Sequence, residues 1–145
     1  MSSSRRVPIP TYKGRSLGIV ALVAAQVLVG AVHLFFGFWL ASASGTLSIF
    51  GGANVSSDIY NIYTIVFSLL TLFFAAGLWL QKRWGGVGTV AVLAFVIVAD
   101  SLTLLNLPSV PGIPKFAGAG EITYGVLVIL YLLQARIRAK YQIHI

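Results

Sequence analysis

Residues 17–41 are LGIVALVAAQVLVGAVHLFFGFWLA, an apolar run in which Gln26 and His33 are the most polar members. At about 1.5 Å per residue, a helix of this length crosses the roughly 30 Å hydrocarbon layer of a bilayer. A secretory signal is the alternative, because Ala41-Ser42-Ala43 resembles a cleavage site. Signal peptides need an apolar core of only about 7–15 residues. The stretch therefore predicts a helix that stays in a membrane.

Three further apolar segments predict more spans, at about 59–80, 85–107 and 116–135. The last reaches spanning length only by including Glu121. The chain is 58% hydrophobic and 9% charged, whereas soluble domains carry about a quarter charged residues. We expect an all-α membrane protein, a four-helix transmembrane bundle that forms one domain over residues 1–145. Residues 1–16 and 136–145 would be basic tails.

The basic residues predict the orientation of the bundle. Nine of the ten fall on one side of the expected spans, and Lys115 alone falls on the other. An excess of Lys and Arg marks cytoplasmic segments, so both termini should be cytoplasmic in a multi-pass protein of the cell membrane. The net charge of +7 then indicates contact with acidic lipid headgroups rather than nucleic acid. The expected headgroup residues are Arg5, Arg6, Lys13, Arg15, Lys82, Arg83, Arg136, Arg138 and Lys140.

The amino-acid composition excludes several kinds of functional site. The chain has no cysteine, which excludes disulfides, thiolate-bound zinc, iron–sulfur clusters and thiol nucleophiles. It also lacks the phosphate-loop, zinc-protease and serine-hydrolase motifs. We expect no cofactor. Asn54 begins a glycosylation sequon in an outer loop, and Asp58 is placed to cap the second span.

Small and polar residues recur at helical spacing within the spans. Such residues drive helix association in lipid, because an apolar side chain gains no hydrophobic free energy when it leaves the lipid tails for another helix. In the first span, Gln26, Gly30, His33 and Gly37 share one face. We expect these faces to meet, with the helix-packing polar residues being Gln26, Asn61, Thr64, Ser68 and Thr71.

His33, Asp100 and Glu121 are the histidine and acidic residues within the expected spans. Each lies 15 or 16 residues from the inner end of its span, roughly 22–24 Å along a helix. Burying ionisable groups in a membrane is costly, so the three predict a polar cluster at one depth. A hydrogen bond or ion pair between His33 and Asp100, with Glu121 reaching the outer interface, is the simplest interpretation. A proton relay, a metal site or an outward-facing substrate cavity are the functional ones.

Two segments resemble known proteins. GLWLQKRWG at residues 77–85 joins the second and third spans, and YLLQARIRAKY at residues 131–141 closes the last one. Together they resemble a broad group of small four-helix prokaryotic membrane proteins of unknown function. That resemblance implies a fold and no activity.

The leading expectation is a non-catalytic subunit of a larger membrane complex, in an energy-converting or oxidoreductase assembly. Its partners would be the lipid bilayer and other membrane subunits or copies of itself. A small oligomeric transporter or channel that uses His33, Asp100 and Glu121 for proton or cation movement is the alternative. A small metal-binding membrane enzyme is the second alternative.

Overall fold

Five helices and one minimal hairpin make up the part of the chain that the structure describes. The structure is a computed structural model, and it describes residues 11–12, 15–43, 55–110 and 115–141. Strands β1 (Thr11–Tyr12) and β2 (Arg15–Ser16) pair antiparallel. The helices are α1 (Leu17–Ala43), α2 (Val55–Trp79), α3 (Arg83–Leu104), α4 (Lys115–Leu133) and α5 (Ala135–Tyr141).

Three of these helices are long and apolar enough to cross a bilayer. Their apolar spans are Leu17–Trp39, Ile59–Trp79 and Arg83–Leu104. The apolar part of α4, Ala117–Leu132, is shorter. The all-helical architecture and these three helices support a membrane protein, as the sequence predicts. A fourth crossing by α4 stays a prediction.

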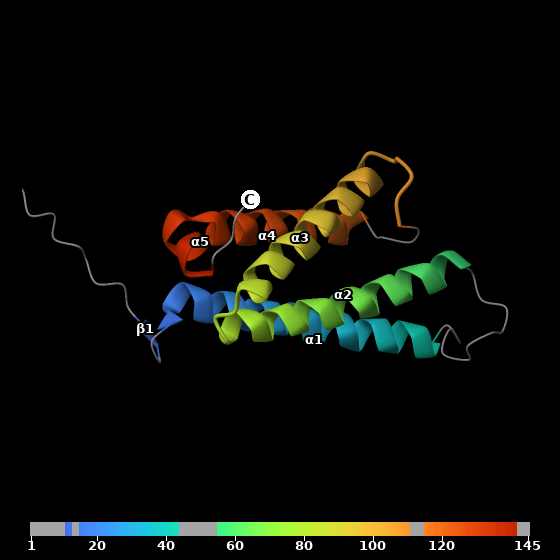
Figure 1. Cartoon of the computed structure of the whole chain (residues 1–145). Coiled ribbons are helices and arrows are strands. Elements are labelled where there is room, and N and C mark those ends of the chain that lie inside the picture. Colours follow the sequence, from blue (N-terminus) through green and yellow to red (C-terminus); the bar gives the residue numbers. More distant parts are fainter. Residues whose placement is uncertain (1–10, 13–14, 44–54, 111–114, 142–145) are drawn as a thin grey trace, which may run out of the picture.

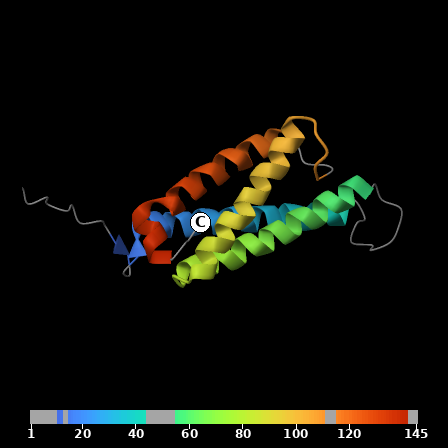
Figure 2. The same ribbon diagram turned by 45° about the horizontal axis from the view of Figure 1, so that its top comes forward.

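The helices pack in chain order. α1 lies along α2, α2 crosses α3, and α3 packs against α4 (Figure 1). The hairpin, the turn between α2 and α3, and α5 gather at one end of the bundle, while the connection between α3 and α4 lies at the other (Figures 1 and 2). The apolar core lies toward the α5 end. Its members include Ile19, Leu22, Ala75, Leu78, Leu93, Val128 and Leu132.

Glycine permits the crossing of α2 and α3. A Cβ added at Gly85 would overlap the backbone of Gly77 and Leu78, and one added at Gly77 would overlap the Trp84 ring and the Gly85 backbone. Trp84 in turn stacks on Phe73, with 4.7 Å between ring centroids. The segment at residues 77–85 is therefore a close-packed helix crossing.

Two helices end in the same hydrogen-bonded cap. At the end of α2, Lys82 N–H donates to the Gly77 carbonyl at 2.9 Å and Gln81 N–H to that of Leu78 at 3.1 Å. Gln81 has φ 56°, so this is a Schellman cap with glutamine in the position that glycine prefers. After α3, Asn106 takes the same conformation with φ 56°. That cap ends α3 at Leu104, earlier than the predicted 107.

The C-terminal segment differs from a simple tail. Helix α4 ends at Leu133, and α5 follows after Gln134. Tyr141 is 1% exposed, and its hydroxyl donates to the Leu78 carbonyl at 2.8 Å. α5 is therefore fastened to the end of α2, a contact between residues 63 positions apart that no local pattern predicts.

Most of the predicted headgroup residues can be placed. Arg15 lies in β2, Lys82 and Arg83 lie at the α2–α3 turn, and α5 carries Arg136, Arg138 and Lys140. All these elements gather at the same end of the bundle (Figure 1). Arg5, Arg6, Lys13 and the sequon at Asn54 lie outside the described residues. Helix α2 begins at Val55, so Asp58 stands inside its first turn rather than at the predicted cap position.

The buried faces contain the small and polar residues of the predicted stripes. Asn61, Thr64, Ser68 and Thr71 are each at most 6% exposed, on the face of α2 that packs inward. On α1, Gly30 meets Leu72 and Ser68, and Gly37 meets Ile65 and Thr64, so these glycines face α2.

Hydrogen bonding divides these polar residues into two kinds. Gln26 Nε2 donates to Thr89 Oγ1 at 3.3 Å and so joins α1 to α3. The Thr64 and Ser68 hydroxyls donate instead to the carbonyls of Tyr60 and Thr64, four residues back in their own helix, at 2.9 and 2.6 Å. Threonine and serine hydroxyls in apolar helices often donate their hydrogen bond to a backbone carbonyl one turn earlier in the same helix. Their contribution between helices is therefore close packing.

Candidate intramembrane polar site

His33 of α1 and Glu121 of α4 form a polar contact between two helices that share an apolar core nearer α5. His33 Nε2 lies 3.1 Å from Glu121 Oε1. The side chains are 25% and 20% exposed. The predicted partner of His33 was Asp100, and that prediction is wrong because α4 rather than α3 presents an acid to the ring. Glu121 accordingly points to His33 and not to the outer interface.

The contacts of His33 fix the proton count of the pair. Nδ1 lies 2.9 Å from the carbonyl oxygen of Val29, which can only accept, so Nδ1 carries hydrogen. Nε2 faces a carboxyl oxygen, and a hydrogen bond there needs one proton between the two atoms. Whether that proton resides on the ring or on the carboxyl, the pair as a whole is neutral.

Asp100 of α3 is the third member and has no such partner. It is 0% exposed, and neither carboxyl oxygen has a hydrogen-bond partner among the described residues. The backbone of α4 comes close, since a Cβ added at Gly118 would lie 3.3 Å from the Asp100 Cβ. His33 and Glu121 are within electrostatic reach of it. An isolated carboxyl in this setting needs a proton or a cation.

The His33–Glu121 pair lies in an open groove between α1 and α4. The groove has a volume of about 610 Å³. Its walls are mostly apolar or small, and they are Val29, His33, Ala117, Ala119, Gly120, Glu121, Thr123 and Tyr124. A Cβ added at Gly120 would meet no atom within 4 Å. The polar pair is thus reachable from outside the bundle, whereas Asp100 behind it is not.

Two tyrosines belong near the cluster and were not predicted. The hydroxyls of Tyr63 in α2 and Tyr124 in α4 are buried and have no hydrogen-bond partner in the described ranges. Tyr124 follows Glu121 by three residues, about one helical turn, so the sequence spacing alone could have predicted that the two side chains are neighbours. Tyr63 has no such signal, because its helix and the cluster meet only in the folded bundle.

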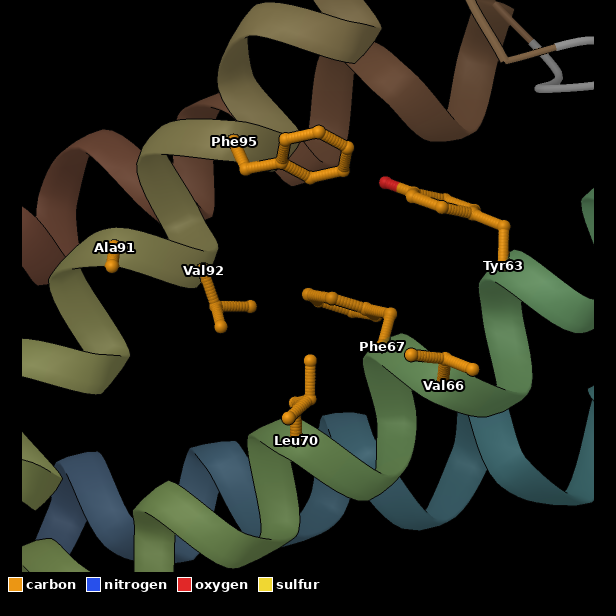
Figure 3. A pocket seen from close by; sticks show the side chains of 7 residues that line it. All are labelled: Tyr63, Val66, Phe67, Leu70, Ala91, Val92 and Phe95. Carbon is orange, nitrogen blue, oxygen red and sulfur yellow. The ribbon is translucent and has the colours of Figure 1, made fainter.

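A second cavity lies between α2 and α3. It has a volume of about 280 Å³, and Figure 3 shows side chains of both helices around it, including Tyr63, Phe67 and Phe95. The remaining walls are Val66, Leu70, Ala91 and Val92, so the cavity has no charged residue. It provides an uncharged counterpart to the groove at Glu121.

The predicted metal site lacks the required donors. Within the described ranges, no group of three or more histidine and carboxylate residues is arranged to hold a metal ion. His33 and Glu121 meet as a pair, and Asp100 lies next to Glu121 without a hydrogen bond of good geometry among the described residues.

Comparison with known proteins does not identify a family. No protein-family model, no curated protein and no solved structure matches this chain. The likeness to small four-helix membrane proteins therefore rests on residues 77–85 and 131–141 alone.

Proposed function

We propose that this chain is a four-span protein of the cytoplasmic membrane, with both ends in the cytoplasm, that moves protons or cations through His33, Glu121 and Asp100. The collection of basic residues at the α5 end of the bundle supports this orientation. The apolar length of α4 falls short of the other three helices, so its crossing needs a locally thinned bilayer or flanking side chains that reach to the interface.

The observation that carries the proposal is the charge balance of the cluster. Two carboxyls and one imidazole together carry one negative charge when all are ionised. The described residues offer Asp100 no basic partner, and the pair at His33 is already neutral. One proton or one cation must therefore be bound for the cluster to be neutral. A site that needs a removable positive charge, and that opens to a groove, suits a carrier.

Reconstituted protein tests this function. Liposomes with an internal pH-sensitive dye and an imposed pH gradient should show protein-dependent proton movement. Asp100→Asn and Glu121→Gln should each abolish it, because each removes a carboxyl while keeping the shape. Thr71→Val is the matched control, since the Thr71 hydroxyl is also buried without a hydrogen-bond partner in the described part of the chain but lies outside the cluster. Absence of flux in the parent protein, or unchanged flux in both variants, would exclude the carrier.

A second candidate is the expected non-catalytic subunit of a larger energy-converting or oxidoreductase complex. The observation that favours it is the outward face of α4, where Ala119, Gly120 and Thr123 are exposed and small. Small residues let a second transmembrane helix approach closely. Purification in mild detergent separates the two candidates. A carrier runs alone or with its own copies, whereas a subunit retains other chains in fixed ratio.

A further inference from the structure

The groove between α1 and α4 is much larger than a proton or an inorganic ion requires. We propose that it binds an amphiphilic organic cation whose charged group pairs with Glu121 in place of His33. This inference deepens the proposed function, on which it rests for the charge balance of the cluster, and names the kind of substrate.

Size and lining favour an organic molecule. The volume of about 610 Å³ falls within the roughly 300–1,000 Å³ of typical small-molecule sites. The walls combine an aromatic residue, Tyr124, with Val29 and small side chains, so they suit apolar substituents. Gly120 leaves space that any other residue would reduce. A molecule of mainly apolar surface with one polar group matches this lining.

The two carboxyl groups determine which charge the polar group of the ligand must carry. An anion would meet the Glu121 carboxyl in the groove and Asp100 behind it, and both would repel it. His33 offers no free hydrogen-bond donor, because Nδ1 is engaged by the Val29 carbonyl and Nε2 by Glu121. An uncharged ligand would gain no charge partner in the groove. A cation gains one in the Glu121 carboxylate, at a site that is only 20% exposed.

Binding is then an exchange that balances in charge. The cation takes the Glu121 carboxylate, and the proton formerly shared with His33 Nε2 leaves the site, so one positive charge enters and one departs. Among the described residues, the other ionisable side chains near the cluster are Tyr60 and Tyr63 from α2 and Tyr124 from α4. These are phenols, which do not ionise near neutral pH. They neither supply nor take up the exchanged proton.

The exposed walls place the entrance at the side of the bundle. Ala119, Gly120 and Thr123 are exposed on α4, within the segment that is apolar enough to contact lipid. A ligand that reaches Glu121 by this route must dissolve in the bilayer. The substrate class is therefore a lipophilic ammonium, guanidinium or phosphonium rather than a hydrated amine.

Binding of tetraphenylphosphonium to the detergent-purified full chain tests the inference. This probe is a permanent organic cation, and triphenylphosphine oxide is a competitor of similar character without the charge. We expect saturable binding of the cation that the oxide does not displace. Glu121→Gln should weaken it at least about tenfold, the effect of 1.4 kcal/mol or more from losing one charge partner.

A pair of leucine variants locates the site. Gly120→Leu adds an apolar side chain to the groove wall at a position where an added Cβ meets no atom within 4 Å, so we expect the fold and the three ionisable residues to persist. It should also weaken binding about tenfold while proton flux in liposomes continues, by the same relation between affinity and free energy. Ala91→Leu narrows the uncharged cavity between α2 and α3 instead and should leave binding within about twofold (Figure 3).

The outcomes separate this inference from the proposed function. Proton flux without saturable phosphonium binding overturns the organic-cation substrate and leaves the carrier standing. Binding that survives both Glu121→Gln and Gly120→Leu, or that Ala91→Leu removes, overturns the assignment to this groove. Failure of both flux and binding in the parent protein removes the carrier and its substrate together.

Discussion

Replacing Gly85 by alanine should weaken the bundle at the crossing of α2 and α3. The new Cβ would overlap the backbone of Gly77 and Leu78, which cannot rotate away, so the helices must separate at their closest point. Overpacking of this kind typically costs about 1–3 kcal/mol. Alanine would regain up to about 1 kcal/mol from its higher helix propensity, less in the first turn of a helix. The expected net loss is about 1–2 kcal/mol.

Gly120→Ala supplies the internal control, because it makes the same chemical change where a Cβ meets nothing within 4 Å. Only the propensity gain applies there, so this variant should be stabilised by up to about 1 kcal/mol. Unfolding in mixed micelles of mild detergent and SDS, followed by circular dichroism, measures both. The two variants should shift in opposite directions. Equal shifts, or a more stable Gly85→Ala protein, would refute the close crossing.

Three further substitutions test separate features by the same unfolding measurement. Gln81→Gly should stabilise the protein by about 1 kcal/mol, because φ is 56° at this position and glycine adopts that conformation without a Cβ penalty. A loss of stability would contradict the cap at the end of α2. Tyr141→Phe should lower the free energy of unfolding by about 1 kcal/mol, the usual net value of one hydrogen bond. The loss stays this small because the Leu78 carbonyl keeps its hydrogen bond from Gln81 N–H. An unchanged stability would mean that Tyr141 does not hold α5 against the end of α2. Gln26→Leu should alter stability by less than about 1 kcal/mol. The hydrogen bond lost is long, at 3.3 Å, and Gln26 Oε1 is already buried with no partner among the residues that the structure describes.

The long helices were predictable because lipid imposes a simple constraint on sequence. An apolar run must be helical to satisfy its own backbone, so the length of each run nearly fixes its helix. The ends are less predictable. The cap at Asn106 stops α3 before its apolar run is over, and the break at Gln134 separates α5 from α4. Both depend on local backbone bonding that apolarity does not report.

The members of the polar cluster were predictable, but their pairing was not. Ionisable residues inside apolar runs are conspicuous, and helical rise places them at one depth. Choosing between Asp100 and Glu121 as the partner of His33 requires knowing which helices face each other. That follows from the glycine contacts of α1 with α2 and of α4 with Asp100, which put Glu121 opposite the ring and Asp100 against the Gly118 backbone.

The division of the bundle into a packed end and an open end bears directly on how a carrier works. Toward α5, α1 and α4 share an apolar core that includes Ile19 and Leu132. Further along, the groove separates them, and the His33–Glu121 pair bridges it. In the proposed carrier, a cation that takes Glu121 from His33 would remove that bridge and leave the core untouched. This part of α4 would then lose its polar contact with α1 and keep its packing against α3 at Gly118, and such a local, ligand-dependent change of helix contacts is what alternating access to two sides of a membrane requires.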